Sequence, residues 1–247
     1  METDKKIIDI VNENYVYGYI LYYLGIHFYN YSEKTLHQVC SELGLNENNV
    51  IKSLESANLD STKDQLILKK YPVHLIIEYL IHAHYQFVKK RLPYLANLVS
   101  NLNNGAGEKG IIEDLKLVFP IFVEDFIQHI YQEEDTFFYH IKLLNKACHG
   151  SYNSAELYYH MERHSVKQFA LDHHIHDDDM TAVTELLEQI NQLPEDNLLL
   201  KVTVAELKNF ERELDIHAKI ENEILFPKAL ELEERVKSKI NSTVRLN

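Results

Sequence analysis

The sequence has few of the residues that interrupt regular structure. Seven glycines and five prolines occur in 247 residues. They cluster between long segments whose apolar residues recur at helical spacing. This scarcity argues against a sheet protein with many turns. It predicts an all-α protein.

Cysteine, basic charge and long apolar runs are also scarce. With only two cysteines, Cys40 and Cys148, the chain has neither a disulfide framework nor a cysteine-based zinc site. The formal net charge is −13 and no long basic run occurs, so we expect no nucleic-acid partner and no anionic membrane partner. No apolar run approaches the roughly 20 residues that span a bilayer, and the N-terminus lacks the apolar core of a signal peptide. We therefore expect a cytoplasmic protein.

The helical pattern divides the chain into two predicted domains. Residues 1–62 form a small helical N-terminal domain, in which Gly25 and Gly44 end helices because glycine tolerates positive φ. Residues 70–242 contain four long periodic segments with short links, which is typical of an up-down four-helix bundle. Pro93 lies inside the first of these segments, where it predicts a kink or a local break.

Two segments of the predicted bundle place a histidine four residues before a glutamate, namely His129 with Glu133 and His217 with Glu221. At about 100° per residue, the members of each pair project from one helical face. Imidazole and carboxylate together are the usual ligands of non-haem iron, and they also suit manganese or zinc. A phenylalanine-containing apolar pair follows each motif within five residues. The repetition indicates a duplicated metal-binding helix.

The other two long segments supply further candidate ligands. His84 lies on the apolar stripe of the first segment, with Tyr85 beside it, and His173 lies on the third segment. His176 follows one turn later on nearly the same face. Because a buried glutamate needs a countercharge, a bound cation accounts for the repeated motifs better than two solvated helix faces do. A lone histidine elsewhere is better explained by a surface role.

At these motifs the chain resembles the repair-of-iron-centres family, hemerythrin-like di-iron proteins with a small N-terminal domain. The segment His217-Ala-Lys-Ile-Glu-Asn-Glu-Ile-Leu-Phe-Pro-Lys-Ala229 is similar to the family's last-helix motif. Similar matches are His129-Ile-Tyr-Gln-Glu-Glu134 on the second helix and Ser165-Val-Lys-Gln-Phe-Ala-Leu-Asp-His173 on the third. The resemblance covers most of the chain. It implies a hemerythrin-like bundle whose metal ligands are His129, Glu133, His173, His217 and Glu221.

Two positions depart from the family's pattern. Tyr29-Asn30 stands where the N-terminal domain of the family usually carries a Cys-Cys pair. Counting back from Leu92-Pro93 places the family's first-helix ligand at Tyr85, one residue after His84. One residue rotates a side chain by about 100° around the helix axis, so His84 replaces that ligand only if the helix changes register. Otherwise Tyr85 is the candidate, as a phenolate ligand.

The resemblance implies a non-haem di-iron protein of the iron-sulfur cluster repair type or of the nitric oxide and oxygen stress response. Nitric oxide or oxygen would be its small ligand, and iron-sulfur proteins would be its clients. Whether it is an enzyme stays open. Two alternatives also stay open: a degenerate sensor or protein-interaction module, and a reversible oxygen-binding protein. The tyrosine-rich stretch from Tyr15 to Tyr31 offers either internal packing or a homodimer contact.

Overall fold

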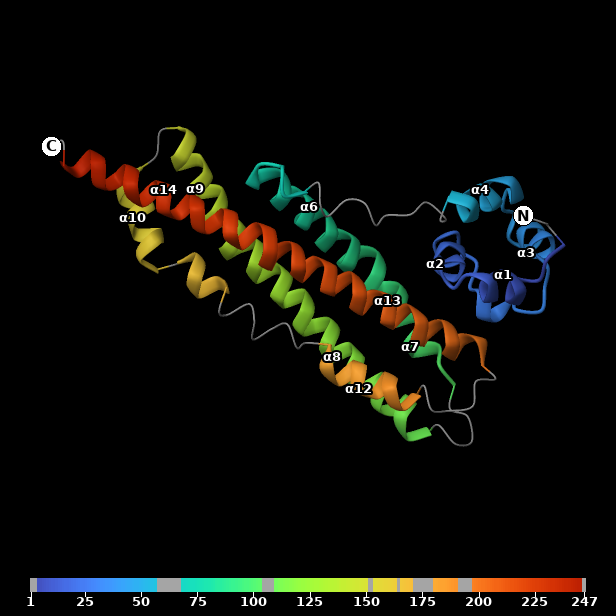
Figure 1. Ribbon diagram of the computed structural model, residues 1–247. Coiled ribbons are helices and arrows are strands. Elements are labelled where there is room, and N and C mark those ends of the chain that lie inside the picture. The colour runs from blue at the N-terminus through green and yellow to red at the C-terminus, as the bar shows by residue number, and fades with distance from the viewer. Residues whose placement is uncertain are drawn as a thin grey trace. The chain divides into compact units, whose positions relative to one another are not determined.

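The structure is a computed structural model that describes residues 4–56, 68–103, 109–150, 153–163, 165–170, 180–190 and 197–245. Within these ranges every regular secondary-structure element is a helix (Figure 1). The only β interaction in them is an isolated antiparallel bridge between Lys6 and Thr35. The all-α prediction is therefore confirmed for the described part of the chain.

Local interactions and backbone conformations explain where two of the N-terminal helices begin or end. Thr35 caps α3 (Leu36–Leu43) through a capping box with Gln38, in which side chain and backbone exchange hydrogen bonds. Gly44 ends this helix with φ of +65°, and Gly25 follows α2 (Val16–Tyr23) with φ of +83°. Both predicted glycine stops are thus present, and each uses a backbone conformation that costs other residues more. The remaining elements here are α1 (Ile7–Glu13), η1 (Phe28–Asn30) and α4 (Glu47–Ser56).

The rest of the described chain consists of long helices, several of which continue directly into one another. The elements are α6 (Val73–Gln86), η2 (Phe87–Arg91), α7 (Leu92–Asn101), α8 (Lys109–Glu133), η3 (Glu134–Phe138), α9 (Tyr139–His149), α10 (Ser154–Arg163), α12 (Thr181–Ile190), α13 (Leu198–Ile220), η4 (Glu221–Leu225) and α14 (Phe226–Arg245). None of the described helices is long and apolar enough to cross a membrane.

The chain forms two compact units. The first contains residues 1–62, 91–119 and 183–210, and the second contains residues 63–90, 120–182 and 211–247. In the second unit α9 packs against α14, α10 and α6, and α14 lies along α9 in Figure 1. A continuous apolar core joins these helices, with Ile76, Leu80, Phe138, Ile141, Leu144, Leu225 and Ala229 among its buried members. The predicted domain boundaries and the up-down order of four helices stay predictions.

Three π-helical turns interrupt the long helices of the described chain. They are η2, η3 and η4, each five residues long. A π turn accommodates one extra residue in a helix and is often found at functional sites. Two of these turns are followed by a proline, Pro93 after η2 and Pro227 after η4. Proline has no backbone N–H, so the carbonyl four residues before it cannot receive its usual helical hydrogen bond. The irregularity predicted at Pro93 therefore takes the form of a π turn just before it.

Candidate metal centre

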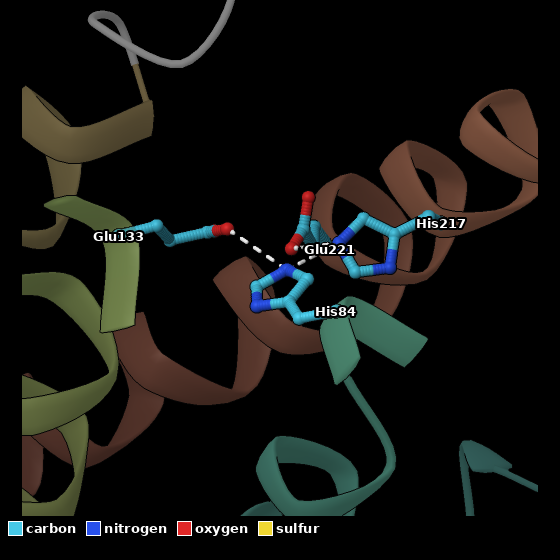
Figure 2. A group of neighbouring side chains, drawn as sticks. All are labelled: His84, Glu133, His217 and Glu221. Carbon is cyan, nitrogen blue, oxygen red and sulfur yellow. Dashed lines mark hydrogen bonds and ion pairs between the residues drawn. The ribbon is translucent and has the colours of Figure 1, made fainter. Parts of the chain in front are cut away.

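Four side chains from three continuous helices converge in the second unit. His84 comes from the last turn of α6, Glu133 from the end of α8, His217 from α13 and Glu221 from the start of η4. One ligand atom from each lies within 4.8 Å of those from the others. Figure 2 shows the His84 ring between Glu133 on one side and His217 with Glu221 on the other. Such a group of nitrogen and oxygen donors is suited to a metal ion.

The distances within the group match the edges of one coordination shell. His84 Nε2 lies 3.0 Å from His217 Nε2 and 3.5 Å from the Oε2 atom of Glu133. His217 Nε2 lies 2.9 Å from the Oε1 atom of Glu221. Two ligands at right angles, each about 2.1 Å from an ion, lie about 3.0 Å apart. The donor atoms are therefore spaced as ligands of a shared cation are.

Burial of the group also fits a bound cation. His84 is 2% exposed, Glu133 6% and Glu221 0%. Removing a carboxylate from water is costly unless a positive charge or hydrogen bonds replace the lost solvation. Two carboxylates in this group bring two negative charges, and the two imidazoles are neutral when they act as ligands. A divalent or trivalent ion supplies the missing charge, so the residues fit a metal.

The structure brings His84 rather than Tyr85 into the group. Tyr85 is 54% exposed, whereas His84 is buried. The π turn η2 lies between His84 and the Leu92-Pro93 landmark, and it adds one residue to the helix there. This extra residue is the register change that His84 needs to take the position that a regular helix gives to Tyr85.

The duplicated histidine-glutamate motif reappears in the structure as a duplicated local geometry. The turn η3 begins directly after Glu133, and η4 begins at Glu221. Each glutamate therefore stands where a regular helix passes into a π turn. The sequence repeat was visible, but uniform helical periodicity gave no sign of the turns themselves.

Side chains around the group hold the imidazole rings in place. The Phe138 ring is stacked on His84, with centroids 5.6 Å apart and planes 6° from parallel. The Phe87 ring meets His217 edge-on, with centroids 5.5 Å apart. On the outer edge of His84, the Nδ1 atom lies 2.8 Å from the Oε1 atom of Glu134. Burial raises the pKa of the Glu134 carboxyl above its ordinary value.

The other predicted ligands are not part of this group of four. His129 is half-buried on α8, one turn before Glu133. His173, the predicted third-helix ligand, and the nearby His176 lie outside the described residues. The sequence interpretation missed Glu134 as the partner of His84. The only sign of Glu134 in the sequence was that it directly follows the predicted ligand Glu133.

No protein-family model matches the chain, and no curated protein matches it. The family resemblance of the motifs therefore stays a prediction.

Proposed function

We propose that the chain is a non-haem di-iron protein built on a hemerythrin-like, up-down four-helix bundle, of the iron-sulfur cluster repair or nitric oxide and oxygen stress type. One observation carries the proposal: one buried histidine, one part-buried histidine and two buried glutamates from three continuous helices converge within 4.8 Å. Two such glutamates suit a pair of ions, because a carboxylate has two oxygens and can bridge them. His129 and His173 would be the additional ligands that a second ion needs.

Each residue of the group has a definite task in this proposal. Glu133 and Glu221 compensate the positive charge of the metal in a site that excludes water. His84 and His217 are neutral nitrogen donors that suit iron in its lower oxidation state. Iron, when bound, supplies the redox chemistry and the open coordination position for nitric oxide or oxygen. The Phe138 ring stacks on His84 and the Phe87 ring meets His217 edge-on, so each imidazole has an apolar aromatic neighbour.

The repair-of-iron-centres family, which the motifs resemble, carries a Cys-Cys pair in its N-terminal domain. Tyr29 and Asn30 stand at that position here, so our proposal includes no thiol chemistry there. Tyr29 occupies that position and its hydroxyl donates a hydrogen bond to the Oδ1 atom of Asn97 at 2.7 Å. The same hydroxyl lies 3.1 Å from Nδ1 of His27. Tyr29 is thus part of the packing of the first unit. The proposed chemistry accordingly resides in the histidine-glutamate group.

The proposal is tested by the metal content of protein purified without oxygen, measured by mass spectrometry. We expect two irons per chain in the wild type and a loss of both in the double variant Glu133→Gln, Glu221→Gln. Glu223→Gln is the matched control, because Glu223 lies exposed in the same π turn as Glu221. Iron retained at the wild-type level in the double variant would overturn the proposal. A wild type that stays metal-free after anaerobic loading with iron would favour the sensor or interaction module instead.

A further inference from the structure

We propose that Glu134 is a positioning residue: it fixes His84 in the tautomer that carries its proton on Nδ1 and so directs the Nε2 lone pair toward the metal position. The inference rests on the proposed metal-binding function and extends it to a residue outside the ligand set. The contact that carries it is the 2.8 Å hydrogen bond between His84 Nδ1 and the Oε1 atom of Glu134.

The chemistry of the two groups sets the direction of this hydrogen bond. A neutral imidazole has one N–H donor and one bare nitrogen acceptor, while an ionised carboxylate only accepts. Glu134 therefore selects the His84 tautomer with the proton on Nδ1. The opposite ring nitrogen, Nε2, is then bare, and it is the atom that faces His217 and Glu133.

The contact between the two histidines agrees with this assignment. His84 Nε2 and His217 Nε2 are hydrogen-bonded at 3.0 Å, so one of them must be the donor. With the proton of His84 on Nδ1, the donor is the Nε2–H of His217. The Nδ1 atom of His217 is then bare, and among the described residues this buried atom has no hydrogen-bond partner. A buried bare nitrogen without a partner is a smaller defect than a buried N–H without one.

Two consecutive glutamates, the last residue of α8 and the first residue of η3, lie on the two sides of the His84 ring. The Glu133 side chain is 4% exposed and its Oε2 atom lies on the Nε2 side of His84, whereas the Glu134 side chain is 29% exposed and lies on the Nδ1 side. Phe138, at the other end of the same π turn, stacks on the face of the ring. This single turn therefore holds His84 at its edge and its face. Rotation of the ring would break both contacts.

A carboxylate that accepts from a ligand histidine fixes the ring orientation and raises the basicity of the ligand nitrogen. Loss of such a partner typically costs about 10- to 100-fold in metal affinity. His217 has no corresponding carboxylate on Nδ1 among the described residues. The two histidines are thus unequal, and the affinity of the centre depends on Glu134 through His84 alone.

The first test is the ring tautomer of His84 in metal-free protein, read from the nitrogen chemical shifts by long-range ¹H–¹⁵N NMR. We expect protonated Nδ1 and bare Nε2 in the wild type, and a shift toward protonated Nε2 in Glu134→Ala. Glu134→Gln keeps an acceptor oxygen and should keep the wild-type tautomer. A wild-type His84 with its proton on Nε2, or an unchanged tautomer in Glu134→Ala, would overturn the inference. Because this readout needs no metal, it stands apart from the test of the proposed function.

The second test is the affinity for Co²⁺, measured by competition with a chelator on the full chain. We expect Glu134→Ala to bind about 10- to 100-fold more weakly than the wild type and Glu134→Gln to recover most of that loss. Asp135→Ala is the matched control, since Asp135 is an exposed carboxylate of the same π turn. Equal weakening in Asp135→Ala would reduce the effect to general charge loss and overturn the inference. Wild-type Co²⁺ affinity in Glu134→Ala would also overturn the inference.

Discussion

The Nε2 atoms of His84 and His217 lie 3.0 Å apart, although 133 residues separate the two histidines in the sequence. Two ring nitrogens that each carry a lone pair repel each other, so they lie this close only when a proton or a cation lies between them. In the metal-free protein this is a hydrogen-bonded proton. A metal ion that takes both nitrogens as ligands replaces the proton, so the contact is a preformed half of a coordination shell.

The first prediction concerns these two histidines as ligands. His84→Ala and His217→Ala each remove a nitrogen donor, and we expect each to lower metal affinity by more than about 100-fold, beyond the loss that an outer partner causes. Equilibrium dialysis against Fe²⁺ without oxygen measures the effect. His82→Ala serves as the control, because His82 is exposed on the same helix and contacts Gln86. Full metal binding by His217→Ala would remove this histidine from the site.

A second prediction separates His84 from Tyr85. Tyr85 is 54% exposed, so its phenol is not expected to ligate the metal. Tyr85→Phe should bind iron with wild-type affinity, and the oxidised wild-type protein should show no tyrosinate charge-transfer band in its visible spectrum. A band that disappears in Tyr85→Phe would assign the phenolate as a ligand after all.

The third prediction concerns the register supplied by η2. Deleting Lys89 removes the extra residue of the π turn, so the helix can become regular and His84 should rotate by about 100° out of the group. We expect metal binding to fall to the level of His84→Ala while circular dichroism still shows a helical protein. Lys89 is exposed, so Lys89→Ala is the control and should bind metal normally. Normal binding by the deletion variant would show that the turn does not set the register.

These turns mark the limit of what the sequence could predict. The helical class, the glycine stops at Gly25 and Gly44 and three of the four clustered residues followed from periodicity and spacing. The choice between His84 and Tyr85 did not, because sequence periodicity assumes a constant 100° per residue and a π turn breaks that assumption locally. The pairing of Glu134 with His84 was hidden for another reason. It joins residues 50 positions apart, and neighbouring glutamates are common on solvated helices.

A buried ion pair in the first unit also escaped the sequence interpretation. Arg91 is 8% exposed and Glu206 1% exposed, and the Nη1 atom of Arg91 donates to the Oε2 atom of Glu206 at 2.8 Å. The Arg91 guanidinium also lies over the Tyr19 ring, 5.2 Å from its centroid. The residues come from positions 115 apart, so helical periodicity assigned each to its own helix and could not join them.

The last prediction follows from this pair. Glu206→Ala leaves a buried guanidinium without its carboxylate, and breaking a buried pair from one side costs about 3–5 kcal/mol of unfolding free energy. The double variant Arg91→Met, Glu206→Leu removes both charges and should lose far less, because apolar side chains of similar volume can replace a buried pair. Urea unfolding of the three proteins measures these differences. As a control, Glu42→Ala breaks the half-exposed Lys34–Glu42 pair of the same unit and should cost less than about 1 kcal/mol. If the double variant proved as unstable as Glu206→Ala, the loss would come from packing around the side chains, and the charge pair would not be its cause.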